Sequence, residues 1–171
     1  MYGDEERAKT LTNTAVFAAL ITAGGWLSIP LFAVPFTLQT LFLLLASAVM
    51  KERAAFPALL YAAAGLIGLP VFHNGTAGLA VILGPTGGFI LGFIPAAYLA
   101  GLFFRKQQDA AAVISATVVC AVCGTLWFML TSGASLPAAL LACVVPYIAG
   151  DTLKGIAAVA AAKRIRRIQN D

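Results

Sequence analysis

Charged residues divide the chain into long apolar blocks. After a charged start that ends at Lys9, no formally charged residue occurs before Lys51. The next charge-free block runs from Ala54 to Phe104, and a third block, with a single acid and a single base inside it, precedes Lys163. About 20 apolar residues are enough for a helix to span a membrane. Each block is longer than that, so each predicts a pair of helices.

Prolines and glycines place one break in each block. Pro30 and Pro35 interrupt the first block, because proline removes a backbone donor and forces the preceding residue out of helical geometry. A glycine-rich stretch at 68–88 and the segment 131–137 interrupt the other two. The pattern predicts an all-α membrane protein, a six-helix transmembrane bundle that occupies residues 1–171 as a single membrane domain. The predicted helices lie near residues 12–29, 36–50, 54–69, 85–104, 110–130 and 137–162.

The composition favours a bilayer as the solvent for this chain. Of its 171 residues, 61% are hydrophobic and 11% are charged, whereas soluble domains carry about 25% charged residues. Too few charges remain to keep a globule of this size dissolved in water. The strands of a membrane β-barrel would alternate apolar and polar residues, and these blocks do not.

The Lys and Arg residues mark one face of the membrane. All but one of the 11 lie before the first predicted helix, between helices two and three, between four and five, or after the sixth. The positive-inside rule assigns that face to the cytoplasm. We therefore expect a multi-pass protein of the cell membrane with both termini cytoplasmic. Membrane orientation also explains the net charge of +4, so no nucleic-acid partner is expected.

The remaining cation, Lys154, lies beside Asp151 inside the last predicted helix. Counted back from Lys163, Asp151 is about 18 Å deep at 1.5 Å per residue, near the middle of a ~30 Å hydrocarbon core. Ionisable groups at that depth are functional candidates by default. The pair predicts a site in which Lys154 meets an anionic group and Asp151 accepts N–H donors. A self-neutralising pair that only locks two helices is the alternative. Pro146 and Gly150 are expected to open the helix just before the pair.

Other polar residues give weaker signals. Gln39, with Thr37 and Thr40, is predicted either to reach a pocket or to bond a neighbouring helix. The segment 70–76 is either an inward-folding lid or a short glycine-rich connection. His73 is the only histidine. We interpret it as a loop residue or a hydrogen-bond donor of the lid, and no metal site is expected.

The cysteines and tryptophans suggest structural roles. Cys120 and Cys123 form a C-x-x-C pattern inside an apolar helix, and Cys143 stands alone. Small core residues are the favoured interpretation, since a zinc or redox site would need further ligands or an activated thiolate. Trp26 and Trp127 fall near the outer ends of their helices and are predicted to join the interfacial aromatic belt.

Four short blocks follow one another along the chain. They are VPFTLQT at 34–40, GLIGLPVF at 65–72, GPTGGF at 84–89 and DTLK at 151–154. Together they resemble the BioY family, the biotin-binding S components of energy-coupling factor (ECF) transporters, and the resemblance covers nearly the whole chain. It implies a six-helix membrane protein that captures biotin from outside. Many members work with a transmembrane coupling protein and two cytoplasmic ATPases.

The resemblance also implies ligand contacts. Asn74, Asp151 and Lys154 are expected to contact biotin, which offers ureido N–H donors, a ureido oxygen, an apolar thioether ring and a carboxylate. We expect Lys154 to bind the carboxylate or the ureido oxygen and Asp151 to accept from the ureido N–H groups. Some members carry a basic residue near the start of the fourth helix. Here Phe89 follows the glycines, so weaker binding or replacement by loop backbone donors is expected.

A stripe of small residues lies on the first predicted helix. Ala15, Ala19 and Ala23 recur at intervals of four residues, a spacing that lets helices approach closely. The family resemblance implies that such a face docks the coupling protein. Ordinary packing within the bundle is the alternative.

Three functions compete at this stage. The leading hypothesis is a substrate-capture subunit for biotin uptake across the cell membrane, energised by a partner ATPase module. A stand-alone proton-coupled secondary transporter of a small anionic solute, with Asp151 as its proton site, is the alternative. A scaffold subunit that binds no small molecule is the third. The chain has no Walker A pattern and no hydrolase motif, so we expect neither enzymatic activity nor a cofactor.

Overall fold

The protein is built almost entirely from helices. The computed structural model describes residues 2–30 and 34–170. Its longest helices are α1 (Tyr2–Trp26), α2 (Gln39–Met50), α3 (Ala55–Leu66), α5 (Gly87–Arg105), α6 (Asp109–Ser132) and α8 (Ile148–Asn170). The shorter elements are β1 (Ser28–Ile29), β2 (Phe36–Thr37), η1 (Lys51–Ala54), η2 (His73–Gly75), α4 (Leu79–Leu83), α7 (Leu136–Cys143) and η3 (Val145–Tyr147). The predicted all-α bundle with six main helices is confirmed.

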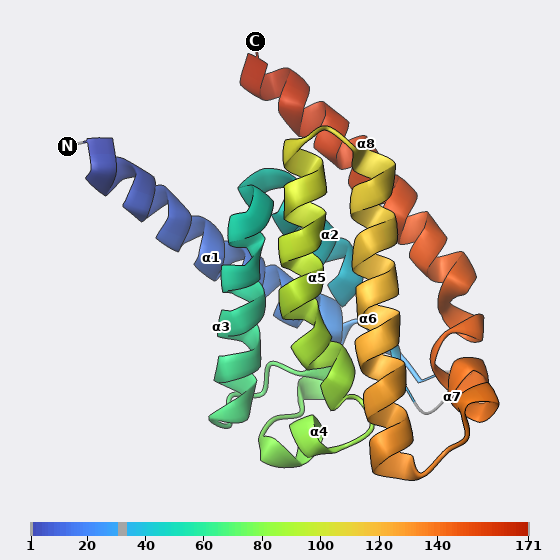
Figure 1. Ribbon diagram of the computed structural model, residues 1–171. Coiled ribbons are helices and arrows are strands. Elements are labelled where there is room, and N and C mark those ends of the chain that lie inside the picture. The colour runs from blue at the N-terminus through green and yellow to red at the C-terminus, as the bar shows by residue number, and fades with distance from the viewer. Residues whose placement is uncertain (1, 31–33, 171) are drawn as a thin grey trace.

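The bundle has two distinct ends. Figure 1 shows both termini at one end, which we call the inner end, while α4 and α7 lie at the opposite, outer end. The first turns of α1 project away from the other helices. Alanines at the contacts between the remaining helices, among them Ala46, Ala58, Ala96, Ala100 and Ala112, are completely buried. Such small side chains let helices approach closely in a membrane protein.

Helix length varies strongly across the bundle. Within the described residues, three segments are long and apolar enough to cross a membrane: Gly87–Arg105, Asp109–Ser132 and Leu136–Arg167. By contrast, α2 and α3 have 12 residues each, about 18 Å at 1.5 Å per residue. Both are shorter than a ~30 Å hydrocarbon core. Neither helix is long enough by itself to cross such a core.

The last predicted helix is not continuous. The prediction of one helix over 137–162 is wrong, because α7 ends at Cys143 and α8 begins at Ile148. Val144 has φ −124° and ψ −59°, outside helical geometry, and Pro146 lies in the short η3 turn between the helices. Proline cannot donate the hydrogen bond that would continue the helix. The break lies where Pro146 led us to expect an opening.

The second predicted helix begins later than expected. It starts at Gln39 rather than at residue 36, because Phe36 and Thr37 form an antiparallel pair with β1, in which Ser28 is opposite Thr37. The Leu38 N–H then donates to the Gly24 carbonyl of α1 at 3.0 Å. These contacts hold the chain before α2 extended. Residues 31–33 of the predicted break lie outside the described residues.

The connection between α3 and α5 folds inward. Phe72 is completely buried and packs edge-to-face on Tyr61, with ring centroids 5.4 Å apart. Its ring lies against Gly65 of α3, where a Cβ atom would approach it to 2.1 Å. Of the two predictions for segment 70–76, the inward-folding one therefore describes the structure.

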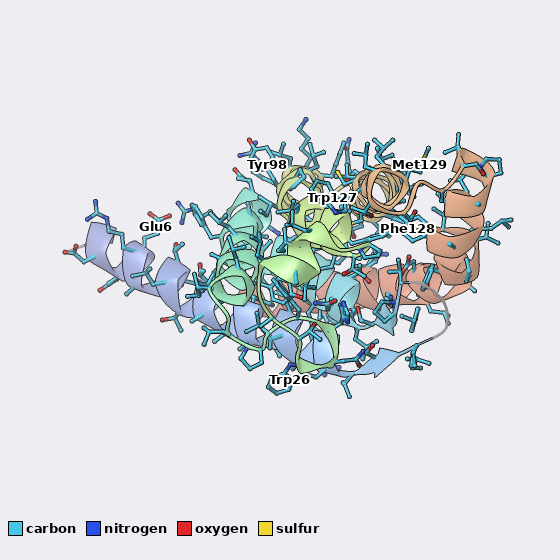
Figure 2. All side chains as sticks on the ribbon, turned by 90° about the horizontal axis from the view of Figure 1, so that it is seen from below. Glu6, Trp26, Tyr98, Trp127, Phe128 and Met129 are labelled. Carbon is cyan, nitrogen blue, oxygen red and sulfur yellow. The ribbon has the colours of Figure 1, made fainter. Side chains whose placement is uncertain are left out.

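Two tryptophans hold this connection from opposite sides, as Figure 2 shows. The Trp26 indole N–H on α1 donates to the Pro70 carbonyl at 3.1 Å. The Trp127 indole N–H on α6 donates to the Gly84 carbonyl at 3.0 Å. Trp26 is largely exposed at the outer end, as expected of a residue in an aromatic belt. Both residues also satisfy loop carbonyls that sequence alone did not connect to them.

Candidate functional site

A small cavity lies between three parts of the bundle. They are the segment just before α2, the start of α5, and the break between α7 and α8 with the first turns of α8. Its volume is about 80 Å³. The polar side chains that line it are Thr37, Gln39, Thr40, His73, Thr86, Tyr147, Asp151 and Lys154. Aromatic and aliphatic side chains complete the wall, chiefly Phe36, Phe89, Ile90 and Phe93. A mostly apolar pocket with a few convergent polar groups is the usual form of a small-molecule site.

The two ionisable residues predicted as a site form an ion pair in this cavity. The Lys154 ammonium lies 2.9 Å from the Asp151 carboxylate and donates to the Thr40 hydroxyl at 3.1 Å. Lys154 is only 7% exposed. Thr40 belongs to α2, so the pair connects α8 to α2 as well as lining the cavity. Charges so deeply buried are compensated by partners of this kind.

Phe36 covers the ammonium group. Its ring centroid is 3.9 Å from the Lys154 nitrogen, a cation–π contact. The same ring stacks on Tyr147, with centroids 6.4 Å apart and an angle of 11° between the planes. It also lies against Gly150, where a Cβ atom would come within 2.2 Å of it. Gly150 therefore makes room for Phe36 above the ion pair.

Gln39 was predicted either to reach a pocket or to bond a neighbouring helix, and its side chain does both. Its side chain lines the cavity, and its amide N–H donates to the Tyr61 hydroxyl on α3. Its carbonyl accepts from the Thr37 hydroxyl at 3.1 Å. Gln39 is therefore held in a fixed orientation between the cavity and α3.

His73 lines the cavity, whereas its neighbour Asn74 does not. The His73 Nε2 atom lies 3.3 Å from the Thr86 hydroxyl, and its Nδ1 atom is buried without a hydrogen-bond partner in the described part of the chain. Burial lowers the pKa of His73 from its ordinary value. Asn74 adopts a left-handed φ of 56° and its side chain is exposed. The predicted contact of Asn74 with a ligand stays a prediction.

Sequence reasoning missed two aromatic residues of the site. Tyr147 precedes Asp151 by four residues, the spacing of one helical turn, and its hydroxyl donates to the Val34 carbonyl. Phe36 stands in the VPFTLQT block but has no polar group to draw attention to it. The proximity of Tyr147 to the ion pair in sequence was a usable signal. The position of Phe36 follows only from the pairing of β1 with β2.

Cys120 and Cys143 pack inside the bundle, and Cys143 also lines the cavity. Cys120 and Cys143 are both buried, each in a separate apolar cluster. Cys143 also lines the cavity, which its isolated position in the sequence did not indicate. Among the described residues, no three His, Cys, Asp or Glu side chains lie close enough to hold a metal ion.

The alanine stripe of α1 faces outward. Ala15, Ala19 and Ala23 are all exposed, whereas Ala18 and Ile21 on the opposite side of the helix are buried. Packing within this bundle, one of the two predicted roles, therefore does not account for the stripe. A docking role for it stays a prediction.

Comparisons with known proteins agree with this architecture. The BioY family model matches residues 3–171. The biotin transporter BioY of Thermotoga maritima is 42% identical over 102 residues, which cover 59% of this chain and 60% of that protein. The probable biotin transporter BioY of Pyrococcus horikoshii is 34% identical over 161 residues, 94% of this chain and 98% of that protein.

A solved structure has the same fold. The crystal structure of the S-component for biotin from an ECF-type ABC transporter aligns with a TM-score of 0.87 at 27% sequence identity. The alignment covers 95% of this chain and 93% of that chain. From the family match over residues 3–171, the relatives and this shared fold, it follows that the chain belongs to the BioY family.

Proposed function

We propose that this chain is the substrate-capture subunit of a biotin uptake system in the cell membrane. One observation carries the proposal: the partly buried ion pair of Lys154 and Asp151 lines a mostly apolar cavity near the outer end of the bundle. The relatives are named as biotin transporters, and the matching structure is an S-component for biotin. A cation, a carboxylate and an apolar wall match the carboxylate, ureido group and thioether ring of biotin.

We infer a ligand group for each partner of the ion pair from the donors and acceptors that the pair leaves free. Lys154 has three N–H donors and uses two of them on Asp151 and Thr40. The third is available for the carboxylate or the ureido oxygen of biotin. Asp151 accepts from Lys154 through one oxygen, which leaves its second oxygen for a ureido N–H donor.

Binding requires the cavity to expand. A volume of about 80 Å³ is well below the ~300–1,000 Å³ of typical small-molecule pockets. Phe36 is the side chain best placed to make room, because it covers the Lys154 nitrogen and lies on the short β2 strand rather than in a helix. We propose that biotin displaces the Phe36 ring and takes its place above the ammonium group.

Equilibrium titration of biotin into the purified protein in detergent tests the function and the site. We expect the unmodified protein to bind and both Lys154→Ala and Asp151→Asn to weaken binding by about 10- to 100-fold, the effect of losing one hydrogen bond to a charged group. Arg164→Ala, which changes an exposed cation on the same helix, is the matched control. Absence of binding by the unmodified protein would overturn the function. Unchanged binding by both site variants would overturn the site alone.

We further propose that a transmembrane coupling protein docks on the alanine stripe and that two cytoplasmic ATPases energise uptake. The exposure of Ala15, Ala19 and Ala23 supports a partner on that face. Ala19→Leu should reduce biotin uptake by cells and leave biotin binding by the purified protein unchanged. Val16→Leu enlarges an exposed residue beside the stripe and serves as the control. Equal uptake by the two variants would contradict the docking role.

A proton-coupled transporter that uses Asp151 makes the opposite prediction about energy. Its uptake would stop when an uncoupler collapses the proton gradient while ATP is still available. We expect uptake that persists under those conditions and stops when the ATPases are inactivated. We also infer that the inner end faces the cytoplasm, because almost all Lys and Arg residues lie there. Of two reporters fused to the C-terminus, one that works only in the cytoplasm and one that works only outside it, the first alone should therefore be active.

A further inference from the structure

A second and larger hollow lies between α6 and α8, on the outside of the bundle. Its volume is about 670 Å³, within the ~300–1,000 Å³ of ligand pockets. Val113, Ile114 and Val118 of α6 form one wall, and Ile148, Ile156 and Val159 of α8 form the other. We call this hollow the α6–α8 groove. Figure 1 shows α8 running obliquely past α6.

Contacts at two points join α6 and α8 along the groove. At the inner end, the Arg166 guanidinium donates to both oxygens of Asp109, at 2.8 Å and 2.5 Å. Further along, Gly155 of α8 lies so close to Val113 of α6 that a Cβ atom on Gly155 would approach that side chain to 2.5 Å. The helices are therefore joined to each other while the groove beside these contacts faces outward.

The groove extends from the inner end of the bundle toward the outer end. On α6 it runs from Ala110 to Ala121, about 17 Å at 1.5 Å per residue, and on the oblique α8 from Ile148 to Lys163, about 22 Å. One leaflet contributes about 15 Å of the ~30 Å hydrocarbon core. In the apolar stretch of α6 only 28% of the residues are buried within the chain, and in that of the α7–α8 segment only 17% are. The groove thus lies on a lipid-facing surface and is at least as long as one leaflet is thick.

A cation stands at the inner end of the groove. Lys163 lines it there and takes part in none of the ion pairs formed within the described part of the chain. Arg166, three residues away, is already neutralised by Asp109. The only acidic residue of the lining is Asp151, which lies toward the middle of the membrane and is paired with Lys154. At the depth of the lipid headgroups, the groove therefore carries the positive charge of Lys163, which no acid within the described part of the chain neutralises.

We propose that the α6–α8 groove binds one anionic phospholipid of the inner leaflet, with an acyl chain between α6 and α8 and the phosphate on Lys163. A chain of that leaflet has the length and the apolar character that the groove offers. A helix from another subunit would bury the unpaired cation of Lys163 unless it supplied an acid. Because Asp151 lines both the groove and the small cavity, the bound chain also covers that carboxylate from the bilayer side.

Native mass spectrometry of the purified protein, titrated with phosphatidylglycerol or phosphatidylcholine of identical acyl chains, tests the headgroup contact. We expect one retained lipid and about fivefold tighter binding of phosphatidylglycerol, the effect of one Lys at an anionic lipid surface. Lys163→Gln should abolish that preference, and Arg164→Gln should keep it, because Arg164 is an exposed neighbour outside the groove. Equal affinity of the unmodified protein for both lipids, or equal loss in the two variants, would overturn the contact.

A second pair of variants tests the groove itself. Ala160 lines the groove and Ala157 is exposed on the same helix outside it. Ala160→Phe fills part of the groove and should lower retention of both lipids several-fold, whereas Ala157→Phe should not. Unchanged retention by Ala160→Phe would place the lipid elsewhere and overturn the proposal. If the unmodified protein is a dimer and Ala160→Phe makes it a monomer, the occupant of the groove is a second copy of this chain. That result would also overturn the proposal.

Discussion

The two ends of the bundle are held together by different interactions. At the inner end, tight turns such as η1 join the helices, and ion pairs connect α1 with η1, η1 with α5, and α6 with α8. At the outer end, the connections carry no Asp, Glu, Lys or Arg. There the buried Phe72 ring and the two tryptophan hydrogen bonds fix the long connection between α3 and α5.

The difference follows from where charge is present. Lys and Arg gather at the inner end, so acids of neighbouring helices can pair with them there. Without charges, the outer connections depend on apolar burial and on satisfying their own backbone groups. The small cavity is lined by outer residues such as His73 and Thr86 together with the ion pair of α8. The proposed substrate site is thus placed against the end that is not restrained by ion pairs.

The largest effect is expected at the outer end, from Phe72→Ala. Removing a completely buried aromatic ring should lower the free energy of unfolding by about 3–5 kcal/mol. Leu69→Ala, at an exposed position of the same connection, should change it little. Denaturant unfolding in detergent measures both. Similar losses in the two variants would show that the connection is not held by Phe72.

A smaller effect is expected at the inner end, from Arg166→Gln. The variant breaks a two-point, partly buried ion pair with Asp109 and should cost about 1.5–3 kcal/mol of unfolding free energy. Arg167→Gln changes an exposed neighbour and is the control. In a double-mutant cycle with Asp109→Asn, the two losses should be strongly non-additive. Additive losses would refute a direct pair.

The exposed ion pair of the inner end should contribute still less. Arg53 and Glu6 lie 2.8 Å apart, with side chains that are about half exposed or more. Arg53→Gln should cost about 0.2–1 kcal/mol. Because the pair faces water, high salt should reduce the difference between variant and unmodified protein. A cost that is independent of salt would indicate that Arg53 acts through packing.

The smallest expected effect concerns pH at the outer end. Burial lowers the pKa of His73 in the folded protein, so the neutral ring contributes stability above the ordinary histidine pKa of about 6.5. That contribution should be lost as the pH falls through the lowered value, because the buried ring must then take up a proton. Unfolding measured between about pH 7.5 and about pH 5 should show a weaker acid dependence in His73→Gln. An identical profile would exclude this role.

Local patterns predicted a large part of the fold. Blocks free of charge and broken by proline or glycine located the main helices apart from the break between α7 and α8, because apolar length and backbone chemistry act within a few turns. The same scarcity of charge singled out Lys154 and Asp151, which the structure joins in one ion pair. The role of Asn74 came from the family resemblance, and the structure leaves its side chain exposed.

Sequence alone determined three things: that the chain belongs in a membrane, at which helix ends the basic residues lie, and which two charges lie inside an apolar block. Each of these properties depends only on residues that are neighbours in the sequence. Only the tertiary structure decided that Phe36 covers Lys154, that Thr40 is its second partner and that α6 and α8 enclose a groove ending at Lys163. Those contacts join segments separated by many residues. Their geometry depends on how whole helices pack, which no local pattern specifies.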